Sequence, residues 1–369
     1  MTARELWSTE VGPDRSALLS VGTDGGCLVA HSTWLAFYSS DGTHRWQQPT
    51  VGTVYEPPVV TADGTIHRIE GGQLVARDPA SGQVASQVPA PKGTTLVADP
   101  WGGLAYRESD PSGGSTLHSV TATGQRRWSI PLPGRGMISY VPFAYDDLLL
   151  AVYGGLLRAI DREGRTRWLL GHDGFREPGN ETVSEQDAVE LWTSIRRITA
   201  STLLIGLKWY TGRRLFVVDV AAKTGYPLVA DFVPQLPIAV LTDSAGRFAF
   251  AVQGPKHEVR QMDWQFPIVL LDARGNRLWE HQLRTPPTQL LNGRDGALFV
   301  SSTPSLTRYD RYRTWQDFSK DAYLRCLGPD GVERWTWYAP GPLTHLPVAR
   351  PDGVVYLGSE GRLWALADG

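Results

Sequence analysis

One short pattern recurs about every forty residues along this 369-residue chain, with longer gaps where insertions occur, and six of its eight copies end in tryptophan. The pattern passes through an apolar stretch, an aspartate and a glycine turn, roughly Ala-x-Asp-x-x-x-Gly-x-x-x-Trp. Its clearest copy is Ala159–Trp168, and a degenerate copy spans Val218–Tyr226. The positions in the tryptophan phase are Trp7, Trp46, Gln87, Trp128, Trp168, Tyr226, Trp279 and Trp335. Self-similarity at a fixed period indicates an architecture in which each repeat is one supersecondary unit.

The repeats also contain inner strands joined by tight turns. Val59–Ile69 reads as a strand, an Asp-Gly turn and a second strand, and Val348–Leu357 reads the same way. Asp-Gly between apolar runs predicts a hairpin, because glycine adopts positive φ without steric cost. Four short antiparallel strands per repeat, arranged radially, make the blades of a β-propeller. We therefore expect an all-β chain that forms a single β-propeller domain over residues 1–369.

The last repeat is split between the two ends of the sequence. Leu363–Gly369 stops before the outermost strand of its blade, and Glu5–Ser8 carries the sequence of such a strand. Because a propeller has to close, we expect the N-terminal strand to complete the last blade. The count is then eight blades. Seven blades is the alternative if the degenerate copy at Val218–Tyr226 does not form one.

The repeat resembles the tryptophan-docking repeat of the pyrroloquinoline-quinone (PQQ) dehydrogenases, a quinoprotein-like propeller family, over nearly the whole chain. The resemblance implies that the tryptophans pack between neighbouring blades against a glycine turn. Many members of that family stack their quinone on a vicinal disulfide, whereas Cys27 and Cys326 here are far apart in sequence. We find no convincing set of calcium ligands either. We therefore expect no cofactor, and a propeller without the quinone-binding features.

Composition limits the function classes. A formal net charge of −2 argues against a general nucleic-acid binder, which needs a basic excess to displace counterions. The first residues, Met1–Trp7, contain no apolar run, and no long apolar run follows. We therefore expect a cytoplasmic protein without a membrane partner. The two cysteines lie in apolar runs and are expected to be buried free thiols. The scattered histidines show no metal-ligand spacing, so no metal site is predicted.

Three insertions interrupt the repeat, at His172–Trp192, Gly254–Gln265 and Pro304–Lys320. In propeller topology all three fall on one face, called the top face here, and on consecutive blades. Long loops on one side of a rigid scaffold usually carry function. The alternative is that the acidic first insertion pairs with the arginines of the third and simply closes the top.

Aromatic and arginine side chains are concentrated in these top loops and in a neighbouring hairpin. Tyrosine, tryptophan and arginine are the residues enriched in binding hot spots. The candidate binding residues of this kind are Trp209, Tyr210, Trp264, Arg308, Tyr309, Arg311, Tyr312 and Trp315.

A second candidate region is the top of the axial channel, where the innermost strands begin. The polar residues predicted there include Arg15, Tyr55, Glu56, Tyr140, Gln235, Gln289, Thr344 and His345. Glu56 and His345 have the chemistry of a general acid and base, with Tyr140 as a third catalytic group. The alternative is that these polar groups only hold water.

Two functions follow from the sequence. The first is a non-catalytic scaffold that captures a peptide, a protein or a substrate on its aromatic top face, and so assists a biosynthetic enzyme. The second is a cofactor-independent cyclase, hydrolase or lyase of specialised metabolism, acting on a small-molecule substrate through Glu56, His345 and Tyr140. No catalytic sequence motif is present, which favours the scaffold.

Overall fold

A computed structural model describes most of the chain. The residues outside the described part are 1, 13–17, 52–56, 91–95, 110–114, 133–141, 154–155, 172–173, 178–190, 198–200, 210–211, 228–236, 243–245, 253–265, 273, 284, 286, 303–321 and 369. The chain divides into two compact units. Unit 1 consists of residues 1–21, 40–42 and 229–369, and unit 2 of residues 22–39 and 43–228.

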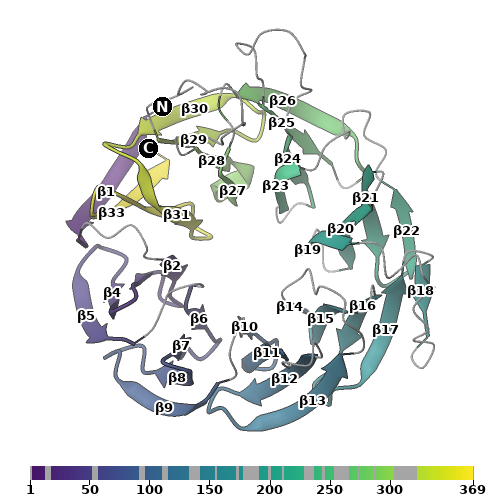
Figure 1. The fold of residues 1–369 in the computed structure, drawn as a ribbon. Helices are drawn as coiled ribbons and strands as arrows, with labels where there is room; N and C mark the ends of the chain where they lie inside the picture. Colours follow the sequence, from purple (N-terminus) through teal and green to yellow (C-terminus); the bar gives the residue numbers. More distant parts are fainter. Residues whose placement is uncertain are drawn as a thin grey trace, which may run out of the picture. The chain divides into compact units, whose positions relative to one another are not determined.

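Across the described residues the strands form eight antiparallel sheets, numbered here as blades 1 to 8 (Figure 1). Blade 1 consists of β2 (Leu18–Val21), β3 (Cys27–Ala30), β4 (Trp34–Tyr38) and β5 (His44–Pro49). Blade 2 consists of β6 (Val59–Val60), β7 (Ile66–Glu70), β8 (Gln73–Arg77) and β9 (Val84–Pro89). Blade 3 consists of β10 (Leu96–Ala98), β11 (Gly103–Ser109), β12 (Ser115–Thr121) and β13 (Arg126–Leu132). Blade 4 consists of β14 (Phe143–Tyr145), β15 (Leu148–Tyr153), β16 (Leu156–Ile160), β17 (Thr166–Gly171) and β18 (Gly174–Arg176).

The other four blades follow the same antiparallel pattern. Blade 5 consists of β19 (Leu191–Arg197), β20 (Thr202–Trp209), β21 (Gly212–Asp219) and β22 (Thr224–Pro227). Blade 6 consists of β23 (Pro237–Thr242), β24 (Phe248–Val252), β25 (Phe266–Leu271) and β26 (Arg277–Leu283). Blade 7 consists of β27 (Gln289–Asn292), β28 (Leu298–Ser302), β29 (Tyr323–Leu327) and β30 (Glu333–Tyr338). Blade 8 consists of β31 (Leu343–Ala349), β32 (Val355–Ser359), β33 (Arg362–Asp368) and β1 (Ala3–Glu10).

The prediction of an all-β, eight-bladed β-propeller is confirmed. The degenerate repeat forms the complete sheet of blade 5, so the seven-bladed alternative is wrong. The described residues include a single helical turn, η1 (Arg294–Gly296). None of their helices is long and apolar enough to cross a membrane.

The N-terminal strand completes the last blade, as predicted. β1 pairs antiparallel with β33 (Figure 1). Ser8 lies opposite Trp364 and Trp7 opposite Ala365. The ring of Trp7 also packs on Tyr356, with 5.6 Å between the ring centroids. Both ends of the described chain are therefore held in one sheet.

The first insertion differs from the prediction of a loop over His172–Trp192. Its first residues form β18, a fifth strand antiparallel to β17, and Trp192 already belongs to β19. The reason is packing. Phe175 in β18 meets Trp168 edge-on at 5.5 Å between the ring centroids, which covers an indole at the outer edge of blade 4.

Tryptophans of the outer strands pack on glycine turns of the next blade in chain order. In unit 2, Trp46 donates its indole N–H to the carbonyl oxygen of Pro79 at 2.9 Å, and its ring lies where a Cβ atom of Gly82 would be. Gly82 has φ of +68°. The same arrangement joins Trp7 with Gly42 and Ser40, Trp128 with Gly164 and Arg162, and Trp279 with Gly331 and Pro329. The outer strands are thereby tied to a backbone position that only glycine fits.

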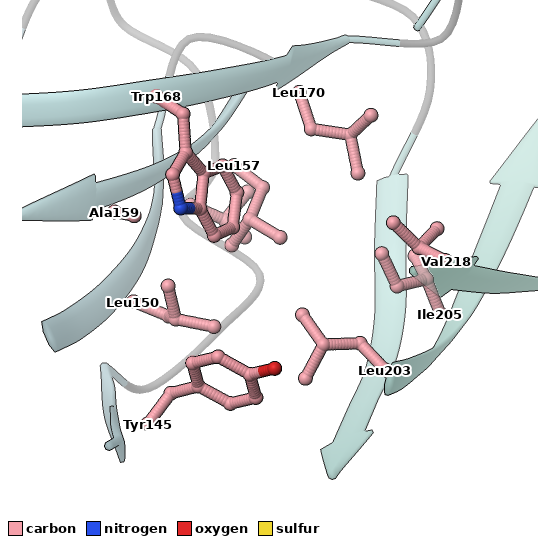
Figure 2. Close-up of a cluster of buried hydrophobic side chains, with 10 residues drawn as sticks. Tyr145, Leu150, Leu157, Ala159, Trp168, Leu170, Leu203, Ile205 and Val218 are labelled. Carbon is pink, nitrogen blue, oxygen red and sulfur yellow. The ribbon is translucent and has the colours of Figure 1, made fainter. Parts of the chain in front are cut away.

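Apolar side chains fill the space between neighbouring blades. In unit 2 one cluster joins blade 4 to blade 5, with Leu157 and Trp168 on one side and Leu203 and Ile205 on the other (Figure 2). Both cysteines are buried free thiols, as expected. Burial raises the pKa of Cys326 to about 12, so this thiol stays protonated.

The glycine turns give the first prediction. Gly82→Ala places a methyl group against the Trp46 indole in addition to straining a left-handed backbone, so we expect a loss of about 2–5 kcal/mol in the free energy of unfolding. Gly102→Ala is the matched control, because Gly102 has φ of +77° and no described atom lies within 4 Å of the point where its Cβ would be. It should lose about 1–2 kcal/mol. Urea denaturation measures both, and equal losses would show that the indole contact contributes nothing.

Candidate functional site

Most of the predicted site residues lie outside the described residues. They are Arg15, Tyr55, Glu56, Tyr140, Tyr210, Gln235, Trp264, Arg308, Tyr309, Arg311, Tyr312 and Trp315. Trp209 is the last residue of β20 and lies opposite Gly212, at the hairpin end of blade 5. These assignments stay predictions.

The described strands fix the points from which two of the insertions start. Residues 253–265 connect β24 to β25, and residues 303–321 connect β28 to β29. Both segments therefore join the second to the third strand of a blade. Blades 6 and 7 are neighbours within unit 1, because their innermost strands β23 and β27 lie side by side. In a propeller, equivalent connections of neighbouring blades leave on the same side, so the strand ends that flank the two segments lie on one face of unit 1.

A buried hydroxyl cluster holds the base of the 303–321 segment. Ser302 and Tyr323 are the strand residues that flank the segment, and they lie opposite each other in the sheet. The Tyr323 hydroxyl is 2.5 Å from Oγ1 of Thr285, and Ser302 donates to the same oxygen at 3.3 Å. All three residues are buried. The two strand residues that flank the segment are thus tied together through the Thr285 hydroxyl.

Two other buried polar atoms at the same end of blade 7 have no hydrogen-bond partner within the described part of the chain. Gln289 begins β27 and lies opposite Ser301 of β28. The two atoms are Oε1 of Gln289 and Oγ of Ser301, and Ser301 is fully buried. A buried polar group without a partner is rare and costs stability, so it calls for an explanation. Sequence reasoning placed Gln289 in the channel but did not single out Ser301.

His345 of blade 8 is packed tightly. It is buried, its Nδ1 lies 2.7 Å from Oγ1 of Thr344, and its ring occupies the space where a Cβ atom of Gly358 would be. β31 carries register shifts on both sides of His345. Innermost strands β27 and β31 are neighbours, so Gln289 and His345 belong to adjacent blades. The predicted acid–base pair with Glu56 lies partly outside the described residues and stays a prediction.

A cluster that the sequence did not suggest lies on blade 3. His118 of β12 is buried between the strands β11 and β13. Its Nε2 is 2.9 Å from Oε2 of Glu108, and its Nδ1 is 2.8 Å from Oγ of Ser129. The Tyr106 ring stacks beside the imidazole, with 4.9 Å between the centroids. A carboxylate, an imidazole and a hydroxyl thus stand in line across three strands, which we call the His118 cluster.

The electrostatics of the His118 cluster favour a neutral imidazole. Burial lowers the pKa of His118, and the nearby Arg126 guanidinium acts in the same direction, while the hydrogen bond to Glu108 opposes them. Burial raises the pKa of the Tyr106 hydroxyl, and an interaction with Arg126 opposes that rise. The cluster therefore holds a neutral ring between a carboxylate and a hydroxyl, with the Arg126 guanidinium nearby.

The register of the strands explains why the cluster escaped the sequence reading. His118 lies directly opposite Tyr106 on one side and Ser129 on the other. Glu108, His118 and Ser129 are separated by ten and eleven residues, a spacing that matches no short motif. Only the strand register of blade 3 brings these three residues together.

A cavity of about 440 Å³ lies in unit 2 between the strands of blades 1 and 2. Its wall is mostly apolar, with Leu28, Phe37 and Ile66, and its charged residues are Asp24 and Arg45. Among the described residues, none of those predicted for the site lines this cavity. Over the same part of the chain, no group of three histidine, cysteine, aspartate or glutamate side chains is arranged to hold a metal ion.

Comparison with known proteins agrees with the repeat. The family model described as outer membrane protein assembly factor BamB matches residues 70–225. The crystal structure of BamB from Moraxella catarrhalis is similar with a TM-score of 0.59 and 15% identity, covering 100% of both chains. Dihydro-heme d1 dehydrogenase NirN in complex with DHE is similar with a TM-score of 0.57 and 14% identity, covering 89% of this chain and 67% of that chain. No curated protein matches the sequence.

Both structures are β-propellers of the PQQ-like type, so the resemblance stated from the sequence is confirmed. At 14–15% identity these likenesses show the fold and nothing finer.

The hydroxyl cluster under the 303–321 segment gives the second prediction. Tyr323→Phe removes one hydroxyl while keeping the ring that lies 5.0 Å from the Arg325 guanidinium. We expect a loss of about 1–2 kcal/mol in the free energy of unfolding, because Thr285 loses its closest partner. Tyr338→Phe is the control, since Tyr338 lies opposite Tyr323 in the sheet but is 61% exposed. Denaturation curves in which the two variants are equally stable would contradict the role given to this cluster.

Proposed function

We propose that the chain is a binding propeller that captures an extended peptide or protein segment, without catalysis, on the face where residues 253–265 and 303–321 emerge. On this proposal it assists a biosynthetic enzyme in the cytoplasm and needs no cofactor. The binding residues are the aromatic and arginine side chains predicted from the sequence, in the first place Tyr312 and Trp315.

The base of this face supports the proposal. Both segments begin and end on strands of neighbouring blades, and the buried Thr285, Ser302 and Tyr323 hold one of the two bases. A rigid base lowers the entropy cost of presenting long segments to a partner. Residues 303–321 contain three arginines, two tyrosines, a tryptophan and a phenylalanine, a composition typical of binding hot spots.

The observation that carries the proposal is the pair of buried oxygens on blade 7. Oε1 of Gln289 and Oγ of Ser301 lie at the end of the sheet where the 303–321 segment starts, and no described residue forms a hydrogen bond with either. A site built to hydrogen-bond a ligand carries such groups at a cost in the free protein, which binding then offsets. Amide groups of an extended backbone supply both donors and acceptors and suit this pair.

The fold comparison is consistent with a scaffold. The matching family model describes an assembly factor, and BamB from Moraxella catarrhalis shares the fold over the whole chain. Propeller folds host many unrelated functions, so the proposal rests on the blade 7 geometry rather than on this likeness.

The aromatic residues give the third prediction. Peptides selected from a displayed random library on the intact protein should bind the wild type, as measured by isothermal titration calorimetry. Their affinity should fall at least about tenfold in the Tyr312→Ala/Trp315→Ala double variant, because each large aromatic anchor contributes more than about 1 kcal/mol. The matched control is Tyr338→Ala, which removes an exposed ring from the outer strand of blade 7. A library without enriched peptides, or equal affinities in both variants, would overturn the proposal.

Ser301 gives the fourth prediction, which separates binding from stability. Ser301→Ala removes a buried hydroxyl that pairs with none of the described residues, so the free protein should gain about 1 kcal/mol in unfolding free energy. The same change should weaken the selected peptides about fivefold or more, because the ligand loses a hydrogen bond. The matched control is Ser359→Ala at the end of β32, whose hydroxyl donates to the Gly341 carbonyl oxygen at 3.0 Å.

Ser359→Ala should lower stability and leave peptide affinity unchanged, which is the opposite pattern. A Ser301→Ala protein that loses stability and binds as well as wild type would show that its hydroxyl has a structural role only.

A further inference from the structure

We propose that Ser129 is an activated nucleophile, with His118 as its general base and Glu108 as a positioning residue, and that it reacts with small, unhindered carboxylic esters. This activity is separate from the peptide site on blades 6 and 7, because the His118 cluster belongs to blade 3 of unit 2.

The geometry of the His118 cluster is that of an activated serine. The Ser129 hydroxyl is 2.8 Å from one ring nitrogen of His118, and Glu108 is 2.9 Å from the other. A nucleophile within hydrogen-bond reach of a base that a third group orients is the signature of covalent catalysis. Because Ser129 lies directly opposite His118, strand pairing itself sets this alignment.

The carboxylate fixes the tautomer of the imidazole. A carboxylate only accepts hydrogen bonds, so Nε2 of His118 carries the proton and donates it to Glu108. Nδ1 then has a free lone pair directed at the Ser129 hydroxyl, which donates to it. The ring is therefore ready to accept a proton from Ser129 and from no other described group.

Burial and the Arg126 guanidinium favour the neutral form of this base, while Glu108 opposes them. The groups around the imidazole are Tyr106 and Glu108 on β11 and Arg126 and Ser129 on β13. Burial first, and then Arg126, lower the pKa of His118 below its ordinary value, so the ring is a neutral base at pH 7. The Arg126 guanidinium also supplies positive charge beside the cluster, where negative charge develops during attack on a carbonyl.

The members of the His118 cluster differ in solvent exposure. His118 is only 3% exposed, whereas Ser129 is an exposed residue of the outermost strand. The nucleophile therefore meets solvent while its base is shielded. Two outer-strand hydroxyls of other blades have different partners: Thr336 contacts Arg325 and Glu333, and Ser8 accepts from Arg362. Neither of these hydroxyls has a neutral imidazole as its partner, as Ser129 has.

The junction between blades 2 and 3 differs from those closed by an indole. Gln87 stands in the tryptophan phase of blade 2, and the smaller Val88 contacts Gly124 in place of an indole. The turn of Gly124 leads directly into Arg126. A valine in place of a bulky ring at this junction is consistent with a reactive group at the outer edge of blade 3.

The reaction balances without a cofactor. Oγ of Ser129 attacks the ester carbonyl carbon as its proton passes to Nδ1 of His118. The C–O bond to the leaving alcohol breaks, and the alcohol takes that proton from His118. An acyl-serine remains, and water hydrolyses it with His118 again accepting a proton and returning it to Ser129.

The fifth prediction tests this proposal with a fluorophosphonate probe. The probe should form a phosphonyl adduct on Ser129 of the intact protein, with loss of fluoride, and peptide mass spectrometry locates it. His118→Gln should slow labelling by at least about 100-fold, the usual contribution of a general base. Hydrolysis of p-nitrophenyl acetate should fall to the buffer rate in Ser129→Ala. Ser86→Ala, an outer-strand serine of blade 2 opposite Ala76, is the matched control and should leave both rates unchanged.

A second measurement uses the wild-type protein and needs no variant of His118. With a neutral base of lowered pKa, the labelling rate of the wild type should level off above about pH 6.5, the ordinary pKa of histidine. An unactivated serine would instead react in proportion to hydroxide across pH 7 to 9. A hydroxide-proportional rate, an unlabelled Ser129, or equal labelling in His118→Gln would each overturn the proposal.

Discussion

The packing of an outer-strand indole on a glycine turn of the next blade is the contact on which the rest of this structure depends. Trp46 on Gly82 shows its two parts, a flat ring that excludes any Cβ atom and an N–H that donates to the turn carbonyl. Where one blade supplies such a ring and the next blade such a turn, this contact fixes how the outer strand of the first blade lies against the second. Where the ring is missing, at Gln87, the following blade carries the His118 cluster instead of a purely apolar junction.

The sequence predicted the fold because its signals are local and repeated. Asp-Gly turns and the tryptophan phase predicted eight blades, and the split repeat predicted the pairing of β1 with β33. β18 was missed because three residues inside an insertion carry no periodic signal, and its support comes from Phe175 packing on Trp168. The site could be predicted only in part. Gln289 was proposed from its position at the start of an innermost strand, whereas Ser301 and the His118 cluster depend on cross-strand register and burial.

The two candidate regions use the sheets differently. On blade 7 the strands provide a base for long segments, and Ser301 carries a buried oxygen that no described residue satisfies. On blade 3 the strands themselves align Glu108, His118 and Ser129, so the reactive group belongs to the scaffold. A propeller suits both uses because its packed blades hold neighbouring strands in a fixed register while loops and outer strands remain accessible.

Closure of the last blade by the N-terminal strand is the central structural claim, and hydrogen exchange tests it most directly. If β1 (Ala3–Glu10) is a full member of blade 8, its paired amides should exchange as slowly as those of β33 (Arg362–Asp368) and open together with them. Exchange of the β1 amides within seconds, while those of β33 stay protected, would contradict the account.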